Sequence, residues 1–329
     1  RSRRAREAFA AAAGAEGVAR SRTLRALVRE STAAWLALGS SMAAFGYGLA
    51  ALHGRVEPLA WAADTFVLNP SPERTAPALI VAFWLLSLLA GVGLSPEPMR
   101  DRGGFRICCW LVVTKIVARK WYHFLAVLMF SPALCLNPVF TAMAFVGALI
   151  AFATAEAVRL GGLYPVSDPL DAFMSRYLDE RESGPLIVSH SYLLLGCALP
   201  LLLTLTFAGD GFDHPASVLA SSGIISLGIG DSFASIVGST LGKRFLGRVP
   251  GTKKSYEGML AAFVSMALAT AILAKISKPY DDDNTLDWTI SIIPAASTAL
   301  LEVSTDQMDN LFLPIYHFTW TYVAISAAL

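Results

Sequence analysis

Charged residues are scarce in this sequence. Only 16% of the 329 residues are Asp, Glu, Lys or Arg, whereas 55% are hydrophobic. A soluble domain usually carries charge on about a quarter of its residues, so the composition argues against one. The net charge is +1, which gives no general attraction to nucleic acid. No nucleic-acid partner is expected, and no protein partner is evident.

Cysteine is also rare. The four cysteines are Cys108, Cys109, Cys135 and Cys197. All of them lie in apolar stretches and lack the spacing of metal ligands, so neither a disulfide framework nor a zinc site is expected. The sequence has no glycosylation sequon either, because residues 69–71 read Asn-Pro-Ser, with the forbidden proline in the middle.

Apolar runs, in contrast, are abundant, and many approach the length that crosses a bilayer as a helix. They cover residues 33–53, 76–95, 121–136, 138–155, 186–208, 217–240, 258–275, 288–303 and 310–329. Helices satisfy their own backbone hydrogen bonds in lipid. The pattern therefore predicts an all-α, polytopic helical membrane protein with about nine transmembrane helices.

The charge between these runs predicts an organisation and a topology. Residues 1–32 are rich in arginine and form a basic cytoplasmic lead-in, residues 33–118 form N-terminal membrane segments, and residues 119–329 form a C-terminal membrane domain. The short run 105–118 carries Lys115 and is expected to be re-entrant or interfacial rather than spanning. On that assumption the basic loops all fall on the cytoplasmic side, as the positive-inside rule requires.

Asp231 is the most unusual polar residue, because it lies inside the apolar run 217–240. An ionisable group in a membrane segment is costly and marks a functional site by default. A buried lone carboxylate would become neutral, whereas Mg²⁺ or a lysine would keep it charged. We therefore predict a metal ligand or catalytic base at Asp231, with a structural ion pair as the alternative.

A basic, glycine-containing loop follows Asp231. Its first part, Gly238-Ser239-Thr240-Leu241-Gly242-Lys243-Arg244, is one residue short of a Walker A motif and lacks the Ser or Thr after the lysine. Its last part, Gly251-Thr252-Lys253-Lys254-Ser255, offers two lysines to a triphosphate. The glycine spacing equally suits close packing of membrane helices. Glu257, just before Gly258, could orient a lysine, hold a metal or cap the next helix.

Two further segments place polar groups at the ends of predicted spans. Between the last two apolar runs, Glu302 and Asp309 could flank a metal or a substrate hydroxyl, or could belong to a plain polar turn. Residues 119–123, Arg-Lys-Trp-Tyr-His, begin another span. Basic and aromatic residues are ordinary interface anchors, but His123 lies one turn into the membrane and is a candidate for binding or catalysis.

Together these segments resemble the polyprenol kinase family and, within it, the dolichol kinases. The family pattern is an Asp, an Ala three residues later, Gly-xxx-Gly, a basic loop and Lys-Lys-Thr-x-Glu-Gly. The matching residues are Asp231, Ala234, Gly238, Gly242, Lys253, Lys254, Ser255, Glu257 and Gly258, with Ser255 in place of the usual Thr. Residues 119–123, 178–187 and 300–314 also resemble dolichol kinases rather than phytol kinases, so the resemblance covers residue 119 to the end.

The resemblance implies a CTP-dependent kinase of the endoplasmic reticulum membrane, with its active site facing the cytosol. Such an enzyme phosphorylates dolichol to dolichyl phosphate, the lipid carrier for protein N-glycosylation and related mannosylation. The expected partners are dolichol, CTP and membrane lipids. Mg²⁺ or another divalent cation is expected as cofactor, held by Asp231 and Asp309.

The expected roles of the site residues follow from the residues and the resemblance together. The expected catalytic residues are Asp231, His123, Glu302 and Asp309. The expected CTP-binding residues are Gly238, Ser239, Thr240, Gly242, Lys243, Arg244, Gly251, Thr252, Lys253, Lys254, Ser255, Glu257 and Gly258. Among these, Lys253 and Lys254 are expected on the β- and γ-phosphates.

The residues alone leave three alternatives open. The first is a kinase for another isoprenoid alcohol, such as phytol or farnesol. The second is a CTP-dependent cytidylyltransferase that makes a CDP-lipid. The third is a transporter, which is disfavoured because the polar groups gather at one face and no inverted repeat is evident.

Overall fold

The computed structural model describes residues 72–98, 105–107, 111–113, 115–174, 186–187, 189–208, 214–245, 254–277, 288–305 and 309–328, together with five positions between 32 and 40. The chain divides into two compact units, one of residues 1–70 and 154–186 and the other of residues 71–153 and 187–329. The division at residues 32 and 118 predicted from charge stays a prediction.

Helices dominate the larger unit. They are α3 (Pro72–Gly93), α4 (Lys115–Leu136), most of α5 (Pro138–Leu160), α7 (Ser189–Ala208), α8 (His214–Ala220), the π-helix η3 (Ile224–Asp231), α9 (Ser232–Leu241), α10 (Tyr256–Ser277), α11 (Trp288–Ser304) and α12 (Asp309–Ala328). The predicted apolar runs from 76–95 onward, apart from the short run 105–118, each coincide with helix. The all-α prediction is therefore confirmed in its main point, while the run 33–53 falls mostly outside the described residues.

A small antiparallel sheet, in the order β1-β2-β3, departs from that prediction. Its strands are β1 (Glu97–Pro98), β2 (Phe105–Ile107) and β3 (Leu111–Val113). The described part of 105–118 thus forms two short strands and the start of α4, not a helix of its own. Three β-branched residues, Ile107, Val112 and Val113, favour this extended pairing. A re-entrant or interfacial position for the segment stays a prediction.

Four described helical segments are long and apolar enough to cross a membrane. They are Pro138–Leu160, His190–Phe207, Ile224–Leu241 and Tyr256–Ile276. Pro77–Gly93 and Ile290–Ser304 are apolar but shorter. The predicted number of about nine spans, and the side of the membrane on which the loops lie, stay predictions.

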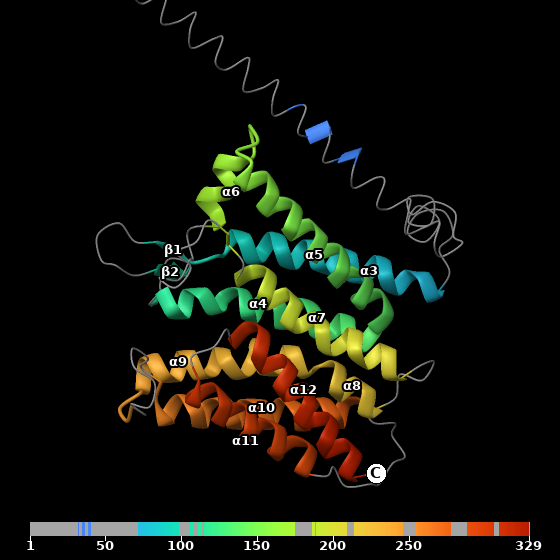
Figure 1. Cartoon of the computed structure of the whole chain (residues 1–329), viewed down its shortest axis with the longest axis vertical. Helices are drawn as coiled ribbons and strands as arrows, with labels where there is room; N and C mark the ends of the chain where they lie inside the picture. Colours follow the sequence, from blue (N-terminus) through green and yellow to red (C-terminus); the bar gives the residue numbers. More distant parts are fainter. Residues whose placement is uncertain are drawn as a thin grey trace, which may run out of the picture. The chain divides into compact units, whose positions relative to one another are not determined.

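Helices α4, α7, α10, α11 and α12 of the larger unit pack around the segment formed by η3 and α9 (Figure 1). Helix α4 contacts η3 and α9, while α10 lies against α9 and α11, and α12 lies against α11 and α7. The core between them contains Leu201, Leu227 and Leu313, which are fully buried. Segments far apart in the sequence are therefore brought to one place, next to the end of η3.

Glycines allow the close approach of η3 and its neighbours. A Cβ at Gly223 would collide with the main chain of Gly196, and one at Gly196 would lie 2.7 Å from Leu227 and 2.9 Å from Pro314. Small residues let membrane helices approach in this way. The π-helical turns end at Asp231, and such turns often occur at functional sites.

The smaller unit is described mainly at the end of α5 and in α6 (Ser167–Met174). Arg159 donates two hydrogen bonds to the Glu156 carboxylate, at 2.8 and 2.7 Å, and a third to Asp171 at 2.8 Å. A guanidinium can make such paired contacts because its donors form a fixed fork. This network ties α6 to the end of α5.

Candidate functional site

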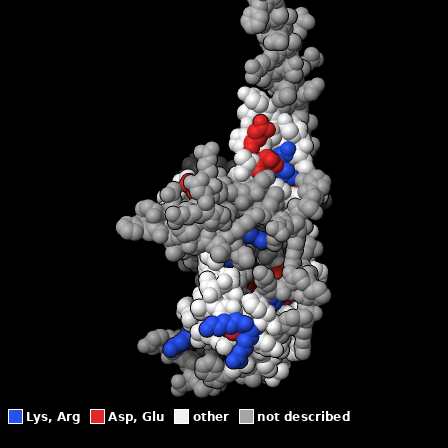
Figure 2. Space-filling model, turned by 90° about the vertical axis from the view of Figure 1, so that its left-hand side faces the viewer, with Lys and Arg blue, Asp and Glu red and all other residues white. Residues whose placement is uncertain are grey.

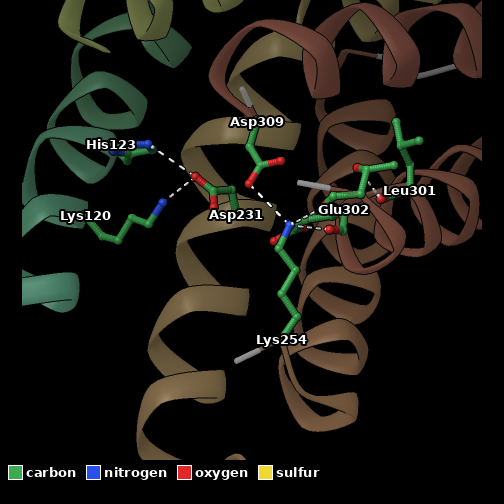
Figure 3. Close-up of polar contacts among 8 residues, drawn as sticks. Lys120, His123, Asp231, Lys254, Leu301, Glu302 and Asp309 are labelled. Atoms are coloured by element: carbon green, nitrogen blue, oxygen red, sulfur yellow. Dashed lines mark hydrogen bonds and ion pairs between the residues drawn. The ribbon is translucent and has the colours of Figure 1, made fainter. Parts of the chain in front are cut away.

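The site is centred on Asp231, the last residue of η3, which is only 5% exposed. Its Oδ2 accepts a hydrogen bond from Nζ of Lys120 and lies 3.3 Å from Nε2 of His123 (Figure 3). Lys120 and His123 are three residues apart on α4, so they share one face of that helix. The buried carboxylate thus has a basic partner, as its burial requires.

A second group of contacts surrounds Lys254, which precedes α10. Its Nζ donates hydrogen bonds to the main-chain oxygens of Glu302 and of Thr305, the latter at 2.9 Å. The same Nζ lies 3.5 Å from Oδ2 of Asp309. The last carbonyls of a helix have no hydrogen-bond partner within it. Lys254 donates to such carbonyls at the end of α11 and also pairs with Asp309, the first residue of α12.

The two groups are neighbours in one polar site (Figure 3). Asp231, Glu302 and Asp309 supply carboxylates from η3, α11 and α12. Lys120 and Lys254 bring positive charge from α4 and from the segment before α10. The predicted acids Asp231, Glu302 and Asp309 are therefore brought together with His123, although they are far apart in the sequence.

The donor set suits a divalent cation only in part. Among the residues that the structure describes, no three His, Cys, Asp or Glu side chains are grouped closely enough to hold a metal by themselves. Mg²⁺ usually takes one or two carboxylates and completes its shell with water and substrate phosphates. Oδ1 of Asp309 is buried and has no hydrogen-bond partner among the described atoms. A divalent cation at Asp231 and Asp309 stays a prediction.

The glycines after Asp231 lie where α9 meets α10. A Cβ at Gly258 would lie 2.9 Å from the Ala234 carbonyl oxygen, and one at Gly242 would lie 2.8 Å from Oγ of Ser255. A Cβ at Gly238 would lie 3.3 Å from the same hydroxyl. The structure therefore favours the helix-packing interpretation of these glycines.

Glu257 fastens the start of the basic loop to the start of α10. Its Oε2 accepts hydrogen bonds from the backbone N–H groups of Lys243, at 3.2 Å, and Arg244, at 3.3 Å. Arg244 in turn accepts a bond from the Tyr256 N–H at 3.0 Å. Gly258 donates its N–H to Oγ of Ser255 at 3.1 Å. The two ends of the loop are thus held side by side.

The remaining predicted loop residues are placed as follows. Ser239 and Thr240 lie exposed near the end of α9, and each hydroxyl donates to the carbonyl of Ile236 in its own helix. Lys243 and Arg244 are exposed, and basic side chains gather on the lower part of the face in Figure 2. Gly251, Thr252 and Lys253 lie outside the described residues.

Lys120 belongs to the charged site but is not among the residues that the sequence predicted for it. It stands in the Arg-Lys-Trp-Tyr-His segment, in which the sequence predicts a functional role for His123. The three-residue spacing of Lys120 and His123 was a usable signal, since residues three apart on a helix are neighbours. Nothing in the sequence, however, showed that this helix face meets Asp231.

The fold and the site define a helical protein with segments long and apolar enough to span a membrane and a charged site between its helices. Comparisons with curated proteins narrow this class. The chain is 34% identical over 262 residues to dolichol kinase EVAN of Arabidopsis thaliana, which is 80% of this chain and 42% of that protein. It is 35% identical over 203 residues to the dolichol kinase of Homo sapiens, which is 61% of this chain and 37% of that protein.

A third similar protein is also named a dolichol kinase. Dolichol kinase sec59 of Schizosaccharomyces pombe is 37% identical over 199 residues, which is 60% of this chain and 37% of that protein. No family model matches the chain, and no solved structure does. The sequence is thus similar to those of dolichol kinases, as its motifs predicted. It spans about two fifths of the length of the curated relatives it matches.

Proposed function

We propose that this chain is a dolichol kinase that transfers the γ-phosphate of CTP to the terminal hydroxyl of dolichol. The observation that carries the proposal is the site itself, in which Asp231 lies within contact distance of Lys120 and His123 and beside the Lys254–Asp309 pair. Its relatives that are named dolichol kinases support the choice of lipid. CTP as the donor comes from the family resemblance.

Phosphoryl transfer depends on positioning and charge neutralisation more than on covalent chemistry. In the proposal, Asp231 and Asp309 hold a divalent cation, Mg²⁺ or another, whose chemistry is to neutralise the phosphates. Asp231 or His123 accepts the proton of the dolichol hydroxyl, because both are within reach of the same point in the site. The basic loop before α10, with Lys253, holds the nucleotide phosphates.

The same proposal places the protein in the endoplasmic reticulum membrane, with the site open to the cytosol. A site at the boundary between water and lipid would receive CTP from one side and the isoprenoid from the other. The isoprenoid tail would lie in lipid or between helices, where large apolar side chains such as Leu86, Leu89 and Ile276 are exposed.

The test uses washed membranes that contain the full chain, CTP labelled in the γ-phosphate, and dolichol, phytol and farnesol offered side by side. We expect labelled dolichyl phosphate from the wild type and a loss of at least about 100-fold in Asp231→Asn or Lys253→Ala. Thr319→Val, an exposed change on α12, is the control for expression. Transfer of label from α-labelled CTP would instead indicate a cytidylyltransferase, and full activity in both variants would refute the assignment.

A further inference from the structure

The two lysines at the site have different surroundings. An ammonium group has three N–H donors. Three oxygens surround the ammonium group of Lys254. Two are main-chain carbonyl oxygens at the end of α11 and in the turn after it, and the third belongs to the carboxylate of Asp309. Lys254 therefore has no donor to spare for a phosphate unless it gives up one of these contacts.

The ammonium group of Lys120 has hydrogen-bond donors to spare. Among the described residues its ammonium has one hydrogen-bond partner, Oδ2 of Asp231. Two of its donors remain for another acceptor. Its side chain is 12% exposed, and Figure 3 shows it reaching Asp231 from the side opposite to Lys254.

A positively charged side chain at this point would act beside the divalent cation of the proposed function. The carboxylates of Asp231 and Asp309 lie where the terminal phosphates of a nucleotide would be, beside the acceptor hydroxyl. A phosphate placed there without a positive neighbour would be repelled. Lys120 is the described lysine that lies next to Asp231, the proposed base, and so can face both the acid and a phosphate.

We propose that Lys120 contacts the terminal phosphates of the nucleotide, and that Lys254 is a positioning residue that holds the end of α11 to the start of α12. The inference rests on the proposed function, because it takes a nucleoside triphosphate as the ligand. It assigns the principal phosphate contact at the acidic site to Lys120 on α4, and not to the Lys253-Lys254 pair of the loop.

The test compares CTP with CMP, because CMP lacks the two terminal phosphates. Binding of each is measured by equilibrium dialysis with the purified full chain, and unfolding is followed by heating. Lys120→Gln should weaken CTP binding by at least about tenfold and leave CMP binding unchanged, while Lys120→Arg should keep CTP binding. Lys254→Gln should lower the unfolding temperature and weaken CTP and CMP by the same factor.

Lys275→Gln, an exposed change in the last turn of α10, is the matched control and should alter neither readout. If Lys120→Gln does not fold, Lys120→Gln with Asp231→Asn removes the unpaired acid as well, and is compared with Asp231→Asn alone. Equal weakening of CTP and CMP by the Lys120 change would overturn the inference, as would a CTP-specific loss confined to Lys254→Gln. A wild-type chain that binds no CTP would instead refute the proposed function.

Discussion

Thr298 on α11 and His317 on α12 are joined side chain to side chain, with Oγ1 of Thr298 2.9 Å from Nδ1 of His317. Thr298 is fully buried and His317 is only 1% exposed. Helix α11 carries Glu302 one turn further on, and α12 begins with Asp309. The contact therefore fixes the relation of two helices that each bring an acid to the site.

The first prediction concerns this contact. His317→Leu should lower the free energy of unfolding by about 1–3 kcal/mol, because the buried Thr298 hydroxyl loses its partner across the helix interface. Thermal unfolding of the purified chain in detergent measures the loss. Thr319→Val is the matched control, because Thr319 is exposed and bonds only to its own helix. Equal unfolding temperatures in the two variants would contradict the prediction.

Much of the fold could be predicted from hydropathy alone. An apolar run near spanning length has few structures open to it, since its backbone must satisfy its own hydrogen bonds. This is why the runs of near-spanning length from 76–95 onward coincide with helix. The acids of the site were also predictable, because a carboxylate such as Asp231 inside such a run is too costly to be incidental.

The pairing within the site was not predictable. Lys120 and Asp231 are 111 residues apart, and hydropathy does not show which face of α4 meets η3. The short strands at 105–113 were missed because three-residue strands carry too little pattern to be recognised. The π-helical turns before Asp231 depend on close packing through Gly196 and Gly223, which is a tertiary effect.

A second prediction concerns the glycines between α9 and α10. Gly258→Ala should destabilise the chain by about 1–3 kcal/mol through overpacking, because the added methyl group meets the Ala234 carbonyl at 2.9 Å. Gly147→Ala on α5 is the control, since nothing lies within 4 Å of its added Cβ. The control should be neutral or stabilising, as alanine is favoured over glycine in helices. Thermal unfolding of both variants, measured side by side, decides the point.

A third prediction tests how α4 is held against η3. A Cβ at Gly228 would collide with the side chain of Val127, so Gly228→Ala should push α4 away from η3. Lys120 and His123 would then move from Asp231, and the rate of phosphate transfer should fall by about tenfold or more. Val127→Ala in the same chain makes room for the methyl group and should restore much of the activity.

The double variant makes this third prediction specific. If Gly228→Ala reduces activity and Val127→Ala does not restore it, the loss has another origin than contact between these two side chains. The comparison also requires Val127→Ala alone, which leaves a small gap and should cost less activity than Gly228→Ala. Each rate is measured per amount of folded chain, so that a fall in yield is not counted as a fall in rate.

A fourth prediction separates the roles that the sequence left open for Glu257. If Glu257 acts by accepting the N–H groups of Lys243 and Arg244, the amide oxygen of Gln can replace its carboxylate, whereas Ala cannot. We expect Glu257→Gln to keep KM for CTP close to that of the wild type. Glu257→Ala should raise it by about fivefold, because the hydrogen bonds to the two backbone N–H groups are lost.

The other two roles, metal ligand and helix cap, predict different effects of the Gln and Ala variants. A metal ligand needs the negative charge, so Gln would then impair phosphate transfer about as much as Ala, and added Mg²⁺ would partly offset both changes. A residue that only caps α10 with its charge would alter the unfolding temperature in both variants while leaving KM unchanged. Measuring KM, kcat and the unfolding temperature for the two variants therefore assigns Glu257 to one role, and a Gln variant as defective as Ala would exclude the loop-fastening role.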